Sequence, residues 1–133
     1  MATIEVPRVE TLDGVGDPCE QILTVFHFLL TSLLSREQAL LHAEYRRPAA
    51  DTTWYLRPRT KDAEGDDETL AVLPSAFLQL CAARLALAMD LSHIEGGHGR
   101  VQMTQDGRRH DCSVYLSNCR DSGCWIRVYG QAV

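Results

Sequence analysis

The sequence has 133 residues, a length that allows one domain and excludes a complete two-lobed enzyme. Hydrophobic residues make up 45% and charged residues 23%, so the chain can bury a core and wholesale disorder is excluded. The formal net charge of −5 lacks the basic footprint of a general nucleic-acid binder, and we expect no nucleic-acid partner.

Three negative features narrow the class of protein further. The longest apolar run, around residues 25–34, is shorter than the about 20 residues of a membrane-spanning helix, so no membrane insertion is expected. Residues 1–17 are acidic and lack the regions of a signal peptide, which predicts a cytoplasmic protein whose five cysteines are reduced. Lys61, the only lysine, follows no glycine loop, so the chain contains no P-loop for ATP.

The N-terminal part predicts a tail followed by a helix. Residues 1–16 are interpreted as an N-terminal tail or a loosely attached edge segment, and residues 17–133 as the single domain. Asp17 can cap a helix that begins at Pro18, and apolar side chains recur behind them at helical spacing. We therefore predict a helix over residues 18–35 with a wide apolar face against a sheet.

Two strands and a second helix are expected next. Residues 39–45 and 52–57 are rich in apolar, β-branched and aromatic side chains, which is typical of two strands joined by a turn. The acidic residues 61–68 are expected to form a solvated loop. The alanine-rich residues 74–91 predict a helix, and three glycines within residues 96–99 predict a loop after it.

The C-terminal third has the pattern of a hairpin and one further strand. Asp106-Gly107 is a two-residue turn signal, and pairing around it places Met103 opposite His110 on a half-buried face. A last strand is expected over residues 124–130. The predicted order is α-β-β-α-β-β-β, an α+β domain with two helices packed on an antiparallel sheet.

His110, Cys112, Cys119 and Cys124 are candidate zinc ligands, and His110-Asp111-Cys112-Ser113 places catalytic residue types side by side in sequence. His110 and Cys112 share a strand face, but there is no Cys-x-x-Cys pair, and the register places Cys112 in the core. Asp111 lies between them in sequence, yet neighbours in a strand point to opposite faces. We therefore expect no metal, no cofactor and no catalytic residue.

Arginines flank the first predicted hairpin at Arg46, Arg47, Arg57 and Arg59. Their guanidinium groups suit a phosphate or an acidic partner surface. Because the chain as a whole is acidic, we prefer to interpret them as solvated edge charge that discourages aggregation of strands.

Five short motifs follow one another in order. They are Ala-Leu-Leu-His-Ala-Glu at 39–44, Trp-Tyr-Leu-Arg at 54–57, Met-Asp-Leu at 89–91, Gly-Arg-Val at 99–101 and Asp-Gly-Arg at 106–108. In this order the chain resembles the second N-terminal domain of type II secretion and type IV pilus assembly ATPases. The resemblance extends over residues 17–130.

The resemblance implies a PAS-like module that lacks the ATPase domain following it in that family. There the module packs on the ATPase domain and contributes arginines to the nucleotide site. Arg100 matches one of these arginines, whereas Ser113 stands where the family has another. The resemblance thus implies a non-catalytic protein-interaction or regulatory domain, with Arg100 as the candidate contact to a partner or a phosphate.

Strand alternation gives Arg100 an independent orientation. It precedes Val101 on the core face, so its side chain is expected to point outward, beside a glycine segment that permits close approach of a partner. The partners considered are a separate secretion or pilus ATPase and a second copy of the chain. The alternative is a small-ligand or nucleotide-sensing PAS-like module with a pocket between the helix at 74–91 and the sheet.

Overall fold

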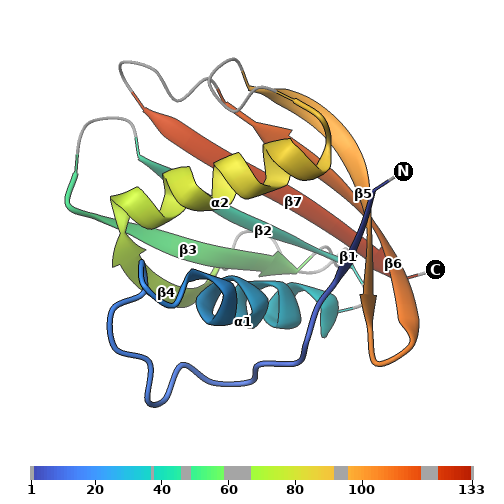
Figure 1. The fold of residues 1–133 in the computed structure, drawn as a ribbon, viewed down its shortest axis with the longest axis horizontal. Coiled ribbons are helices and arrows are strands. Elements are labelled where there is room, and N and C mark those ends of the chain that lie inside the picture. The colour runs from blue at the N-terminus through green and yellow to red at the C-terminus, as the bar shows by residue number, and fades with distance from the viewer. Residues whose placement is uncertain are drawn as a thin grey trace.

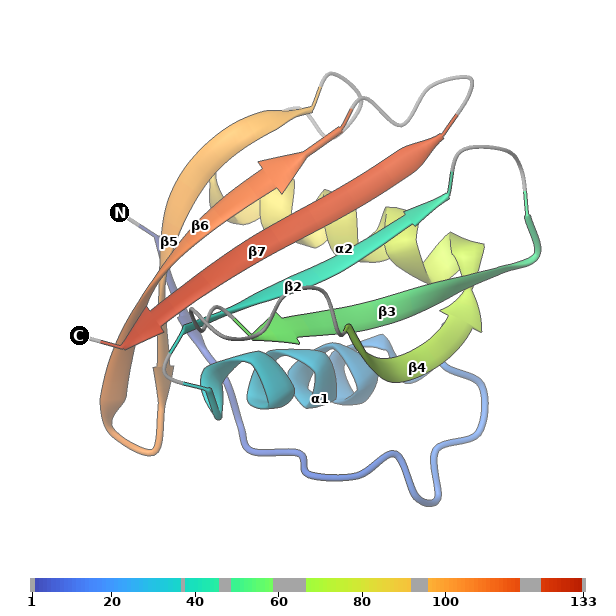
Figure 2. The same ribbon diagram turned by 180° about the vertical axis from the view of Figure 1, so that it is seen from behind.

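The sheet and helices come from a computed structural model that describes residues 2–36, 38–45, 49–58, 67–91, 96–117 and 123–132. Both described helices lie on the same face of one twisted sheet, and neither covers the other face (Figures 1 and 2). The elements in chain order are β1 (Ala2–Glu5), α1 (Ile22–Leu34), β2 (Gln38–Tyr45), β3 (Asp51–Pro58), β4 (Glu68–Pro74), α2 (Ser75–Ala88), β5 (Gly97–Gln105), β6 (Arg108–Leu116) and β7 (Cys124–Ala132).

The described strands form a seven-stranded sheet in the order β1-β5-β6-β7-β2-β3-β4. Every neighbouring pair is antiparallel except β1 and β5, which run parallel. The C-terminal strand β7 therefore lies at the centre of the sheet, between β6 and β2. This placement brings residues from both halves of the chain onto one continuous sheet surface.

The β5–β6 hairpin has the predicted register. Met103 pairs with His110, and the turn residues Asp106 and Gly107 have φ values of 51° and 78°. Two positive φ values are the requirement of a type I′ turn, whose twist matches that of the strands it joins. The hairpin presents its apolar residues to the helices, and Met103 is fully buried.

Helix α1 begins four residues after the predicted start. The side chain of Asp17 accepts a hydrogen bond from the backbone N–H of Cys19 at 2.9 Å, and its carbonyl accepts from Gln21, so a turn precedes the helix. The helix packs on β7 through Leu33. A Cβ built at Gly130 would lie 3.2 Å from Leu33 Cγ, so the glycine permits this close approach.

Helix α2 covers the sheet with a tightly packed apolar face. Phe77, Leu78, Cys81 and Leu85 are at most 1% exposed and belong to the main core cluster. Their side chains pack against the sheet, whereas the C-terminal end of α2 borders a groove of about 320 Å³ that Ile4 and Glu5 of β1 also line. Neither α1 nor α2 has the length and apolarity that crossing a membrane requires.

The predicted order of elements is wrong in two places, because β1 and β4 were missed. Strand β1 is only four residues long, too short for a recognisable alternation, but its parallel pairing with β5 is followed by the buried Val6. Strand β4 follows the acidic segment, and only Leu73 among its residues is buried. The sequence of an edge strand that buries so little carries a weak apolar signal.

The glycine segment before Arg100 was also misassigned. It was expected as a loop, but β5 begins at Gly97 and includes Gly99. A Cβ at Gly99 would lie 2.8 Å from Met89 Sδ, so this glycine accommodates the end of α2 inside the molecule. The contact with Met89 of the same chain explains why residue 99 is a glycine, and no binding partner is needed to explain it.

Candidate functional site

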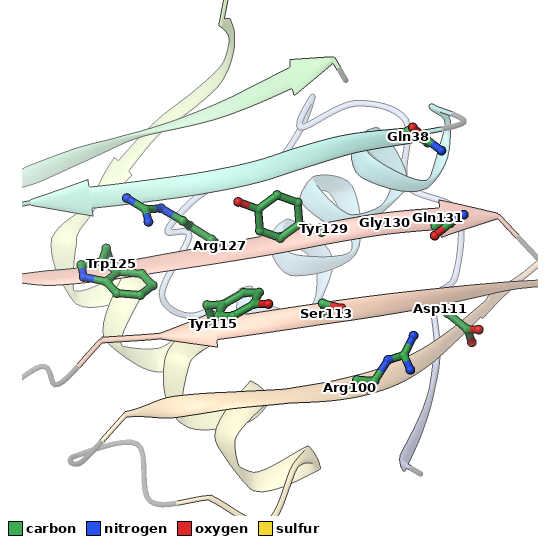
Figure 3. Close-up of a pocket in the computed structure, with 10 residues that line it drawn as sticks. All are labelled: Gln38, Arg100, Asp111, Ser113, Tyr115, Trp125, Arg127, Tyr129, Gly130 and Gln131. Atoms are coloured by element: carbon green, nitrogen blue, oxygen red, sulfur yellow. The ribbon is translucent and has the colours of Figure 1, made fainter. Parts of the chain in front are cut away.

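A hollow of about 380 Å³ lies on the sheet face that α1 and α2 leave uncovered (Figure 3). It is lined by residues of β2, β5, β6 and β7. The lining residues are Gln38, Arg100, Asp111, Ser113, Tyr115, Trp125, Arg127, Tyr129, Gly130 and Gln131.

Strand alternation places these side chains on the uncovered face. In β7, Ile126 and Val128 are buried under the helices, so Trp125, Arg127 and Tyr129 project to the opposite side. The same alternation in β6 and β5 brings further polar side chains to this surface. The hollow is therefore a direct consequence of how the core is packed on the other face.

The pairing of the strands aligns Arg100 with residues far away in sequence. Arg100 pairs with Ser113, Ser113 with Tyr129, Tyr129 with Leu40, and Leu40 with Arg57. One row across five strands thus has an arginine at each end. Leu40 is only 7% exposed although it lies on this face, so part of the row is apolar and shielded from water.

The two arginines of the hollow stand apart from each other. Arg127 lies two strands and two residues from Arg100, which corresponds to about 12 Å between their Cα atoms at ordinary strand spacing. Figure 3 shows Tyr129 and Ser113 between them. Two anionic groups on one extended ligand fit this separation better than a single small anion does.

Aromatic side chains that line the hollow contact one another and Arg127. The guanidinium carbon of Arg127 lies 4.7 Å from the centre of the Trp125 ring, a cation–π contact. Tyr115 packs edge-on against Tyr129 at 5.8 Å between ring centres, and His98 stacks on Tyr115 at 5.7 Å. These contacts restrict the side chains before any ligand arrives, which lowers the entropic cost of binding.

The charges of the hollow are not internally paired. Arg100 is exposed and points outward, as strand alternation predicts, and within the described ranges neither it nor Arg127 forms an ion pair. Asp111 lines the same hollow and lies beside Arg100 in Figure 3. The hollow consequently offers two positive groups and one negative group, an excess of one positive charge.

Arg57, Asp67 and His42 form a hydrogen-bonded cluster next to the hollow, since His42 pairs with Arg127 across β2 and β7. Asp67 accepts hydrogen bonds from Arg57 Nε at 2.7 Å and Nη2 at 3.2 Å, and its Oδ2 lies 3.2 Å from His42 Nε2. The hydrogen bond from Arg57 is the main reason that the pKa of Asp67 is lowered. Arg57 is thereby occupied, whereas Arg46, Arg47 and Arg59 lie outside the described residues.

The candidate metal and catalytic residues do not form one site. His110 and Cys112 point into the core, where burial lowers the pKa of His110 and raises the pKa of Cys112 to about 12. Asp111 projects to the other face. Among the residues that the structure describes, no three His, Cys, Asp or Glu side chains are grouped to hold a metal ion.

The prediction that all five thiols are reduced is wrong. Cys124 is disulfide-bonded, whereas Cys19, Cys81 and Cys112 are free. Cys119 lies outside the described residues. The odd number of cysteines favoured free thiols but does not exclude one bonded pair.

Sequence reasoning identified Arg100 but missed Arg127 and its three aromatic neighbours, Tyr115, Trp125 and Tyr129. The alternation of Ile126 and Val128 was a signal for the outward direction of Arg127. What the sequence did not contain was the order of the strands, which brings β7 beside β6 and β2.

Comparison with known protein families finds no matching family model. Comparison with curated proteins likewise finds no similar sequence.

Proposed function

We propose that this chain is a non-catalytic protein-interaction or regulatory domain that binds an acidic surface of a partner through the hollow of its uncovered sheet face. The observation that carries the proposal is the pair Arg100 and Arg127. Neither is ion-paired within the described ranges, and both border a surface of fixed aromatic rings. Arginine and aromatic residues are the types enriched where proteins bind one another.

The resemblance to the PAS-like N-terminal domains of type II secretion and type IV pilus ATPases suggests the partner. In those proteins the domain packs on an ATPase domain. We infer that a separate secretion or pilus ATPase presents carboxylates to Arg100. Arginine forms two parallel hydrogen bonds with a carboxylate. This arrangement fixes the relative orientation of the two groups and also strengthens the contact.

A small-ligand sensor is the second candidate. The volume of the hollow, about 380 Å³, lies within the 300–1,000 Å³ of typical small-molecule sites. Its two arginines favour an anionic ligand. The hollow opens on the side of the sheet opposite to the pocket that the sequence analysis considered.

Binding of a purified secretion or pilus ATPase to the immobilised chain tests the main proposal. We expect Arg100→Ala to weaken binding by about tenfold or more, as loss of a charge-assisted hydrogen bond implies. Arg108→Ala is the matched control, because Arg108 belongs to the same hairpin, is exposed, and alternates to the helix side of the sheet. Equal affinities of the wild-type and Arg100→Ala chains would contradict the proposal.

A further inference from the structure

The outer face of α2 carries a narrow apolar stripe between the exposed residues Gln79 and Arg84, and no described residue covers that stripe. Leu87 is 82% exposed and Leu80 is 41% exposed, while the opposite face of the helix is buried through Phe77 and Leu85. A contiguous apolar surface that the chain itself does not cover is typical of a site of interaction. The isolated chain therefore covers only one of the two apolar faces of α2.

Four residues form this exposed stripe, which we call the α2 stripe. They are Ala76, Leu80, Ala83 and Leu87, and they are separated by four, three and four residues. That spacing is the one that two helices use when they pack along each other. At 100° per residue the four positions lie together, directly opposite the buried face.

We propose that two copies of this chain pair through the α2 stripe, antiparallel, about a two-fold axis. Small and large residues alternate along the stripe. When the second helix runs antiparallel to the first, Leu87 lies against the partner's Ala76 and Leu80 against the partner's Ala83. Each leucine then contacts the methyl group of an alanine, and the helices approach closely. Parallel pairing would set leucine against leucine and leave gaps at the alanines. The size pattern thus matches a second copy of the same stripe.

Charged residues lie beside the α2 stripe rather than in it, and Arg84 flanks the stripe on the helix itself. The stripe itself carries no charge, so no ionic group is desolvated at its centre. The neighbouring groove of about 320 Å³ is lined by both Arg84 and Glu5, so the rim presents both signs. Ile4 and Leu23 line the same groove and extend the apolar surface beside Leu87.

The size of the surface sets the strength of the pairing. A helix of 14 residues is about 21 Å long, so α2 with the adjoining groove offers a small contact surface compared with the interfaces of obligate dimers. We expect a reversible dimer whose population rises with protein concentration. The hollows around Arg100 remain free and face away from the interface, so the dimer binds a partner with two sites.

Sedimentation of the full chain over a wide range of concentrations, with two charge substitutions, tests the proposal. Leu87→Lys and Ala76→Glu each place a charge against an apolar side chain of the partner, so each alone is expected to weaken dimerisation by about a hundredfold or more. An equal mixture of the two variants is expected to form a heterodimer, because the new ammonium of one chain faces the new carboxylate of the other. Both substitutions also suit the helix dipole at their ends of α2.

The control is Val72→Lys, at a residue of β4 that is 61% exposed and lies outside the α2 stripe, and it is expected to dimerise like the wild type. Equal melting temperatures of all variants would show that the fold is kept. A wild-type chain that stays monomeric at every concentration would overturn the proposal, as would single variants that dimerise normally. A mixture that stays monomeric would overturn the antiparallel arrangement. None of these outcomes depends on binding at Arg100, which is assayed separately.

Discussion

His110 illustrates how a polar side chain on a core-facing position makes stability depend on pH. It is 5% exposed, and burial, followed by the charge of Arg108, lowers its pKa from the ordinary value of 6.5. The unfolded chain therefore binds a proton at a higher pH than the folded chain does. By linkage, this contribution to stability is fully present above the unfolded pKa and is lost as the pH falls toward the folded pKa.

We expect the free energy of unfolding to decrease as the pH falls below 6.5, and His110→Gln to make that decrease smaller. Urea denaturation at a series of pH values measures the slope. His98→Gln serves as the control because His98 is exposed on the other face. Equal slopes for the wild-type and His110→Gln chains would mean that His110 titrates normally in the folded protein.

At the scale of elements, the packing of α1 on β7 depends on a glycine, Gly130, at the point of contact. A Cβ at Gly130 would lie 3.2 Å from Leu33 Cγ and 3.4 Å from its Cδ1. Leu33 is 1% exposed, so surrounding residues limit its retreat. A methyl group at residue 130 is therefore expected to push the helix away from the centre of the sheet.

We predict that Gly130→Ala destabilises the protein by about 1–2 kcal/mol, the usual cost of overpacking a core. The control is Gly16→Ala, where the nearest atom would be Gln21 Nε2 at 3.9 Å, and a change within about 0.5 kcal/mol is expected. Denaturant unfolding measures both. Leu33→Val combined with Gly130→Ala should recover part of the loss, and strict additivity of the two substitutions would argue against their contact.

The elements also show which parts of the fold local sequence can specify. Asp106-Gly107 determines the turn and hence the whole β5–β6 register, because a two-residue loop leaves one pairing that buries the apolar side chains. Nothing local indicates that Ala2–Glu5 joins β5, since that parallel pairing connects segments about a hundred residues apart. The hollow, too, is only partly predictable from local sequence. Strand alternation gives the face on which each side chain lies, but the order of the strands determines which side chains lie next to each other.

At the scale of the whole molecule, the two faces of the sheet serve different purposes. The helix side holds the core and, through the α2 stripe, the proposed contact between copies. The uncovered side holds the separated arginines Arg100 and Arg127 and, among the residues that the structure describes, no glycine loop that cradles phosphates. Two positive groups about 12 Å apart, with Asp111 beside one of them, do not surround a triphosphate.

We therefore predict that the chain does not hydrolyse ATP and binds it no more tightly than millimolar. Ser113 supports this expectation, because it pairs with Arg100 where the resembling ATPases have a second arginine. Titration calorimetry with ATP and a phosphate-release assay measure the two properties, and micromolar affinity would contradict the prediction. Ser113→Arg is the informative variant. It places a second guanidinium beside Arg100, so it should tighten binding of ATP about tenfold if the uncovered face is where anions bind, and leave it unchanged if they bind elsewhere.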